Sequence, residues 1–142
     1  MADSVKLNYV VPPNDFTRAG EASSAVKKTL KKLGIHPDVI RRVAIAMYEG
    51  EINMVIHAHG GEINVEIYPD RVEMVLADRG PGIADIGLAM QAGYSTAPEE
   101  VRNLGFGAGM GLPNMKKYTD EMHVESTLGV GTTVSMTVHN PA

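Results

Sequence analysis

The chain has 142 residues and a mass of 15.2 kDa, which suits one domain of ordinary size. Hydrophobic residues make up 44% and charged residues 21%, which is ordinary globular usage and argues against extensive disorder. The formal net charge of -4 argues against a protein held on nucleic acid mainly by phosphate contacts.

The absence of cysteine excludes disulfides, thiolate metal sites and cysteine nucleophiles. No apolar run approaches the roughly 18 residues that a bilayer-spanning helix needs. We therefore expect a soluble, cytoplasmic protein that binds neither a membrane nor nucleic acid directly. The cluster of Lys27, Lys28, Lys31 and Lys32 forms either a local basic face or an ordinary solvated helix face.

The first part of the chain predicts one strand and two helices. Apolar and polar residues alternate over residues 4–11, and Pro12 ends this strand. Apolar residues three and four apart then predict a helix over about 16–33. A second helix is expected to start at Pro37 and to run to about Ala58.

The rest of the chain predicts four strands and one helix around a long aperiodic segment. The strands are expected at 63–67, 72–76, 122–128 and 132–138, and the helix at about 112–118. Such a long loop region as 78–111 is usually functional in a small domain. The order predicts an α/β (α+β) two-layer sandwich that forms one domain over 1–142. We expect a mixed sheet of about five strands, most of them antiparallel, with three main helices on one face.

The second predicted helix carries a carboxylate and a carboxamide on one side. Glu49 and Asn53 are four residues apart, so they share a face. A carboxylate accepts a proton from an attacking hydroxyl, and a carboxamide oxygen ligates Mg²⁺, so the pair suits phosphoryl transfer. Glu51 points elsewhere on this helix, and we expect it to face solvent.

Two glycine-rich segments follow. The run Asp78-Arg79-Gly80-Pro81-Gly82 comes directly after a predicted strand. An Asp there can accept a hydrogen bond from an exocyclic amino group, and glycines let the backbone turn beneath a planar base. A plain turn is the alternative interpretation.

The second segment has glycine at every other position, at Gly105, Gly107, Gly109 and Gly111, and a helix follows at once. Backbone amides in such a run, together with a helix N-terminus, suit phosphate oxygens. Neither a P-loop nor G-x-G-x-x-G is present. A flexible hinge without a ligand is the alternative.

These segments, in this order and followed by Gly131-Thr132-Thr133, resemble the ATPase superfamily that joins DNA gyrase B, MutL, histidine kinases and the anti-sigma serine kinases. This is the GHKL or Bergerat fold. The resemblance runs from about Val39 to Val138. It implies that ATP and Mg²⁺ are the cofactors.

The resemblance also implies roles for residues of this chain. Glu49 corresponds to the general base and Asn53 to the Mg²⁺ ligand. Asp78 corresponds to the carboxylate that reads adenine, with Gly80 and Gly82 shaping the pocket.

Further implied roles lie nearer the C-terminus. Thr133 corresponds to a residue that supports the adenine pocket from the last strand. Residues 84–111 correspond to a mobile ATP lid, and Arg102 is placed either to reach a γ-phosphate or to lie in solvent. The phosphate loop corresponds to the glycines at positions 105, 107, 109 and 111.

The length of the chain narrows the resemblance, because neither a transducer domain nor a phospho-accepting helical hairpin fits in 142 residues. The chain is similar to stand-alone bacterial serine kinases and anti-sigma factors, and within these to RsbT-like switch kinases. Gly50 and the stretch 97–103 depart from that pattern.

The resemblance thus implies an ATP-dependent serine kinase that acts on a STAS-type anti-sigma-antagonist protein. It also implies a homodimer through the N-terminal strand and first helix. A non-catalytic, ATP-gated anti-sigma factor or switch-binding module is the alternative, with a sigma factor as a further possible partner, and plain ATP hydrolysis is a third.

Overall fold

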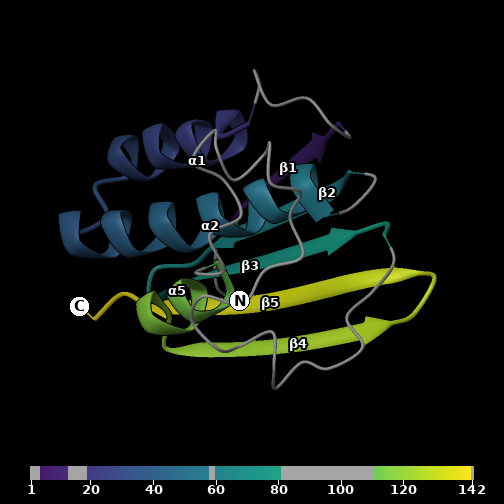
Figure 1. Ribbon diagram of the computed structural model, residues 1–142. Coiled ribbons are helices and arrows are strands. Elements are labelled where there is room, and N and C mark those ends of the chain that lie inside the picture. The colour runs from purple at the N-terminus through teal and green to yellow at the C-terminus, as the bar shows by residue number, and fades with distance from the viewer. Residues whose placement is uncertain (1–3, 13–18, 58–59, 81–110, 142) are drawn as a thin grey trace.

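Five strands and three helices form two layers in the computed structural model, which describes residues 4–12, 19–57, 60–80 and 111–141. Figure 1 shows the helices on one face of the sheet. The strands are β1 (Val5–Val11), β2 (Gly61–Ile67), β3 (Arg71–Asp78), β4 (Glu121–Thr127) and β5 (Gly131–His139). The helices are α1 (Glu21–Lys32), α2 (Pro37–His57) and α5 (Gly111–Tyr118). The predicted two-layer fold class is confirmed.

The sheet has the strand order β1-β2-β3-β5-β4, and all four pairings between its described strands are antiparallel. Strand alternation places one apolar row per strand under the helices. In β2 and β3 this row is at most 4% exposed and consists of Ile63, Val65, Ile67, Val72, Met74 and Leu76. Since a slip of one residue would expose the whole row, burial fixes the register.

Helix α2 is the middle of the helical layer and packs against both α1 and α5. Gly50 explains how closely α2 approaches the sheet. A Cβ atom on Gly50 would overlap Cδ2 of Leu76 in β3 and would touch the Met115 sulfur of α5 at 3.4 Å. The departure at Gly50 is therefore a packing feature. No helix in the described ranges is long and apolar enough to span a membrane.

Helix α1 starts later than expected. Residues 19 and 20 form a turn, and the helix begins at Glu21, so the predicted start near residue 16 is wrong; residues 16–18 lie outside the described part. Gly20 is the N-cap, with a left-handed φ of 96°, and it offers no side chain to cap the helix.

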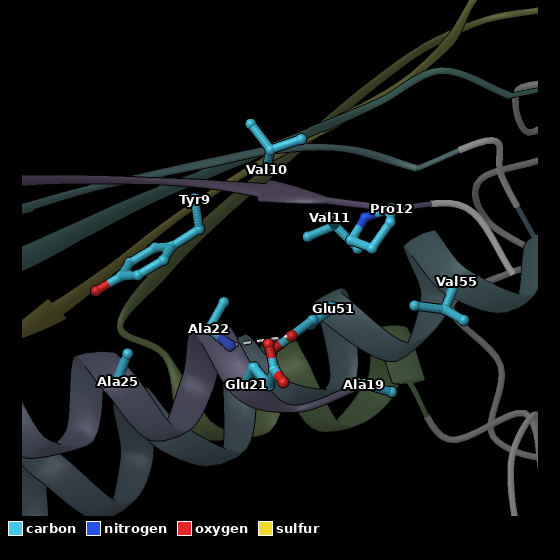
Figure 2. Close-up of a pocket in the computed structure, with 10 residues that line it drawn as sticks. All are labelled: Tyr9, Val10, Val11, Pro12, Ala19, Glu21, Ala22, Ala25, Glu51 and Val55. Atoms are coloured by element: carbon cyan, nitrogen blue, oxygen red, sulfur yellow. Dashed lines mark hydrogen bonds between the residues drawn. The ribbon is translucent and has the colours of Figure 1, made fainter. Parts of the chain in front are cut away.

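The missing cap comes from Glu51 on α2. The side chain of Glu51 is 3% exposed, so the expectation that it faces solvent is wrong. Its Oε2 accepts hydrogen bonds from the backbone amides of Gly20 at 3.0 Å and Ala22 at 3.2 Å. Its Oε1 accepts from the amide of Ser23 at 3.0 Å and from the Ser23 hydroxyl at 2.7 Å. Figure 2 shows Glu51 reaching across to the start of α1.

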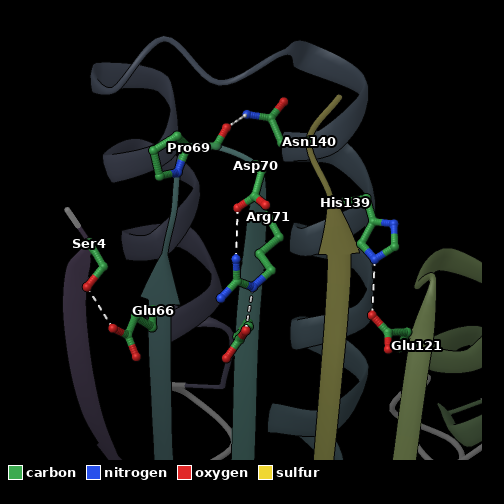
Figure 3. A network of polar contacts seen from close by, with 9 residues as sticks. Ser4, Glu66, Pro69, Asp70, Arg71, Glu121, His139 and Asn140 are labelled. Carbon is green, nitrogen blue, oxygen red and sulfur yellow. Dashed lines mark hydrogen bonds and ion pairs between the residues drawn. The ribbon is translucent and has the colours of Figure 1, made fainter. Parts of the chain in front are cut away.

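Polar contacts fasten the end of the sheet where β3 begins (Figure 3). The Arg71 guanidinium donates to Glu73 at 2.6 Å and to Asp70 at 2.9 Å. After β5, the side-chain amide of Asn140 donates to the Pro69 carbonyl at 3.1 Å. The Arg71 bonds stiffen the start of β3, and the Asn140 bond joins the β2–β3 turn to the end of β5. The candidate site lies at the other end of β3.

Candidate functional site

The structure describes only part of the predicted site. Glu49, Asn53, Asp78, Gly80 and Thr133 lie within the described ranges, and Gly111 is the first residue of α5. The remaining predicted residues lie outside them, together with nearly all of the expected lid over 84–111: Gly82, Arg102, Gly105, Gly107 and Gly109.

Asp78 is the last residue of β3, and its side chain points to the helix side of the sheet because it continues the buried row of Met74 and Leu76. Its Oδ1 accepts a hydrogen bond from the Thr132 amide at 2.8 Å. Burial raises the pKa of the Asp78 carboxyl above its ordinary value, and the Thr132 amide partly opposes this rise.

The second oxygen of Asp78 remains available. Oδ2 accepts no hydrogen bond from any described residue. Among the described residues, no side-chain nitrogen or oxygen is both buried and unpartnered, so Oδ2 is accessible. A half-buried carboxylate with one anchored and one free oxygen is suited to accept a hydrogen bond from a ligand amino group.

Glycines flank Asp78 on both sides. Gly61 opens β2 opposite Asp78, and Gly131 opens β5 with a φ of 153°. A Cβ atom on Gly61 would overlap the Ala77 carbonyl, and one on Gly131 would overlap the Asp78 carbonyl. Only glycine lets the three strand ends approach this closely. Gly61 was not among the predicted site residues, although a glycine at a strand start after a helix is a usable signal.

The loop after β3 is also tied down at its beginning. The Arg79 amide donates to the Gly60 carbonyl at 3.0 Å, and the Gly80 amide donates to the Val130 carbonyl at 3.2 Å. Gly80, two residues after Asp78, therefore lies against the β4–β5 turn.

Thr133 does not support Asp78, which corrects the expectation for this residue. Thr133 pairs with Ala77, and the alternation of β5 turns its side chain to the sheet face without helices. Thr132 lies on the same face as Asp78 and is 7% exposed. Its hydroxyl lies 2.9 Å from the Ser126 hydroxyl, which fixes the start of β5 beside Asp78.

Glu49 faces α5. The side-chain amide of Asn114 in α5 donates to Oε1 of Glu49 at 3.4 Å. Asn53, one turn further along α2, is half-buried. Glu49 and Glu51 of α2 thus point to different neighbours, because Glu49 meets α5 and Glu51 meets α1. Asn114 was missed by sequence reasoning, since its contact spans 65 positions of the chain.

The donor set fits a Mg²⁺ ion that arrives with a nucleotide. The described residues contain no group of three or more His, Asp or Glu side chains that could hold a metal alone. Mg²⁺ commonly takes one or two protein oxygens, several waters and substrate phosphates. The Asn53 carboxamide oxygen suits such a shared site. The first turn of α5 carries no acidic residue, so no side-chain charge there opposes a phosphate.

A separate hollow of about 240 Å³ lies on the α1 side of α2 (Figure 2). Tyr9, Val11, Ala22 and Val55 contribute to its lining, and the oxygens of Glu51 there are already bonded to α1. None of the predicted site residues lines this hollow.

The comparisons with known proteins agree with this geometry. Residues 13–138 match the family described as histidine kinase-like ATPase domain. An anti-sigma F factor of Caldanaerobacter subterraneus subsp. tengcongensis is 37% identical over 103 residues, which cover 69% of this chain and 68% of that protein. An anti-sigma F factor of Pasteuria penetrans is 33% identical over 133 residues, or 86% of this chain and 85% of the relative.

The serine/threonine-protein kinase RsbT of Bacillus subtilis is 32% identical over 112 residues, which cover 76% of this chain and 78% of the kinase. Solved structures share the fold at lower identity. The RsbU and RsbW domains of Rv1364c from Mycobacterium tuberculosis match with a TM-score of 0.60 and 18% identity, over 97% of this chain and 34% of that one. The mycobacterial sensor histidine kinase MprB matches with a TM-score of 0.55 and 17% identity over 99% of both chains.

Proposed function

The chain belongs to the family of histidine kinase-like ATPase domains, and we propose that it is an ATP-dependent protein-serine kinase of a bacterial partner-switching pathway. Its substrate is a serine on a small STAS-type anti-sigma-antagonist protein. The names of the relatives support a regulatory role of this kind, because they include both anti-sigma F factors and a serine/threonine-protein kinase.

The observation that carries the proposal is the free carboxylate oxygen of Asp78 between two glycines. Oδ2 is accessible, while Oδ1 is held by the Thr132 amide at 2.8 Å. Gly61 and Gly131 leave no side chain beside it. In the proposal, Oδ2 accepts a hydrogen bond from the exocyclic amino group of adenine, and Gly80 and Gly82 shape the adjoining floor of the pocket.

In this proposal, residues of α2 and of the segment before α5 bind the phosphates and carry out the transfer. Asn53 supplies its carboxamide oxygen to the Mg²⁺, which neutralises phosphate charge when bound. Glu49 accepts the proton of the serine hydroxyl as the oxygen forms its bond to the γ-phosphorus and the bond to ADP breaks. Asn114 orients Glu49 through their hydrogen bond.

The same proposal includes a lid over 84–111, a glycine-rich loop that binds the phosphates, and a contact of Arg102 with the γ-phosphate, and all three stay predictions. The loop consists of Gly105, Gly107, Gly109 and Gly111. Of these, Gly111 is also the first residue of α5, so the helix N-terminus adds its positive dipole end to the loop amides.

A homodimer through β1 and α1 belongs to the same proposal. In the described sheet, β1 is an edge strand that pairs only with β2. Sedimentation velocity of the pure protein distinguishes a dimer of about twice 15.2 kDa from a monomer.

The second candidate is a non-catalytic, ATP-gated anti-sigma factor or switch-binding module. The two anti-sigma F factors favour it, since each is at least 33% identical to this chain. Both candidates use the same nucleotide site, so the test must separate transfer from binding.

The test incubates γ-labelled Mg·ATP with the pure protein and an extract of its source cells. Glu49→Ala is compared with Glu125→Ala, which removes an exposed carboxylate from β4. Label on a serine of one small protein, kept by Glu125→Ala and lost in Glu49→Ala, supports the kinase. Bound nucleotide without labelled protein supports the binding module. An absence of nucleotide binding refutes both, and a filter-binding assay with Asp78→Asn checks the adenine contact directly.

A further inference from the structure

Charge is divided between the two layers of the fold. The described helices carry eight basic and four acidic side chains, whereas the strands carry two basic and six acidic ones. Half of the basic helical residues lie on α1, which is the outer helix beside α2. A chain with a net charge of -4 therefore carries a distinctly basic surface on α1.

The basic surface of α1 consists of Lys27, Lys28, Lys31 and Lys32, here called the lysine face. All four side chains are exposed. None of them forms an ion pair or a hydrogen bond within the part of the chain that the structure describes. At helical spacing they cover one continuous arc, opposite the buried arc of α1 that holds Val26 and Leu30.

Two of the four lysines in the lysine face do not stabilise the helix that carries them. Lys31 and Lys32 lie in the last turn, where positive charge favours the helix C-terminus. Lys27 and Lys28 lie earlier, each four residues before another lysine, and like charges at that spacing destabilise a helix. Within the described part of the chain, repulsion at Lys27 and Lys28 destabilises α1, and no ion pair or hydrogen bond of these two residues offsets it.

We propose that the lysine face docks an acidic surface of a partner protein; this deepens the proposed function, whose partner is a protein. A membrane helix would need exposed apolar residues, but the apolar side of α1 is buried in the core. Single-stranded nucleic acid would need aromatic side chains for stacking, and the lysine face has none. A long phosphate polyanion would extend beyond the lysine face, and the net charge of -4 disfavours its binding to the rest of the chain.

Exposed lysines of this kind act mainly on association. Complementary charges steer an encounter and raise its rate at low salt, while the dissociation rate depends on the buried centre of the interface. The lysine face therefore predicts partner binding whose association rate falls steeply as salt rises.

The first experiment uses a zero-length carbodiimide crosslinker, which joins lysine amines to carboxylates, on the full chain in an extract of its source cells. Peptide mass spectrometry then identifies both ends of each crosslink. Crosslinks from the lysine face to Asp or Glu of one other protein are expected. Absence of such crosslinks, or crosslinks only to a second copy of this chain, overturns the proposal.

The second experiment measures association of that protein at 50 and 300 mM salt. Lys27→Glu/Lys28→Glu is compared with Lys116→Glu/Lys117→Glu, which reverses two exposed lysines of α5. The first variant places Glu four residues before Lys31 and Lys32, so α1 gains two favourable pairs and does not lose stability. We expect its association rate at low salt to fall about tenfold or more with a flatter salt dependence, and the α5 variant to stay within about twofold.

Equal rates for the wild type and Lys27→Glu/Lys28→Glu overturn the proposal. Retention of the wild type, but not this variant, on duplex DNA or phosphatidylserine vesicles at 150 mM salt also overturns it, in favour of another partner class. Failure of the kinase proposal is distinguishable, because Glu49→Ala leaves the crosslinks of the lysine face in place. Crosslinks without label transfer retain the docking surface and reject the kinase.

Discussion

Replacing Glu51 by Ala tests the link between α1 and α2. Among the described residues, the substitution removes the one side chain that caps α1, since Gly20 has none. Four donors lose their acceptor: the amides of Gly20, Ala22 and Ser23, and the Ser23 hydroxyl. Ala22 and Ser23 are at most 6% exposed, so water does not readily replace the carboxylate.

The expected loss of stability follows from these contacts. A lost N-cap costs about 0.5–2 kcal/mol, and each further buried donor left unpaired costs about 1 kcal/mol, so we expect a loss of about 2–4 kcal/mol. Unfolding entropy of about 2.1 cal/mol/K per residue over 142 residues converts this loss to a fall in Tm of about 7–13 °C.

The assay is thermal and urea unfolding followed by far-UV circular dichroism. Glu49→Ala is the matched control, because it removes the same residue type two positions away, where Asn114 at 3.4 Å is the one hydrogen-bond partner of the carboxylate among the described residues. We expect the control to lose less than about 1 kcal/mol. Glu51→Gln keeps the shape of the side chain but turns its amino group toward two of the donors. Its loss of stability should therefore lie between those of Glu51→Ala and Glu49→Ala. Equal losses for Glu51→Ala and Glu49→Ala would refute the cap.

Three further predictions concern the site and its supports. Burial raises the pKa of Asp78 in the folded state, so ionisation of this carboxyl destabilises the fold as pH rises through the native pKa. Asp78→Asn should therefore be more stable than the wild type in urea at pH 7, and this difference in stability should narrow on acidification. The same variant should bind ATP at least about tenfold more weakly. Gly50→Ala should cost about 1–3 kcal/mol through overlap with Leu76, and a double-mutant cycle with Leu76→Val should show coupling; additive effects would contradict the close packing. The backbone amide of His139, and then Arg42, lower the pKa of Asp120 in the folded state, so its stabilisation is present above the unfolded-state pKa and is lost as pH falls. Asp120→Asn should lose less than about 1 kcal/mol at pH 7 and nothing at acid pH; an equal loss at both would contradict this assignment.

Local patterns in the sequence were sufficient to predict which helices and strands form. The alternation over 63–67 and 72–76 predicted the β2–β3 hairpin, and both strands are present in antiparallel register. This succeeds because burial of one sheet face imposes a period of two on the chain itself. The order of the motifs likewise predicted the family, which the match over 13–138 confirms.

Positions that depend on a neighbour distant in sequence were not predictable in the same way. Periodicity correctly indicated that Glu51 and Glu49 point to different sides of α2, but it could not show that α1 covers the side of Glu51. The start of α1 has the same cause, because its cap comes from α2 and not from the residues before it. Helix propensities weigh only neighbouring residues and cannot include an acceptor that comes from another helix.

The same distinction applies within the site. Local patterns were enough to predict that Asp78 ends a strand beside glycines and that Glu49 and Asn53 share one side of a helix. Which residues meet them depends on tertiary packing, which places Thr132 and not Thr133 beside Asp78, and Asn114 beside Glu49. Residue periods fix the direction of a side chain along its own element. Its partner depends on how separate elements pack, and that is settled only when the hydrophobic layers close on each other.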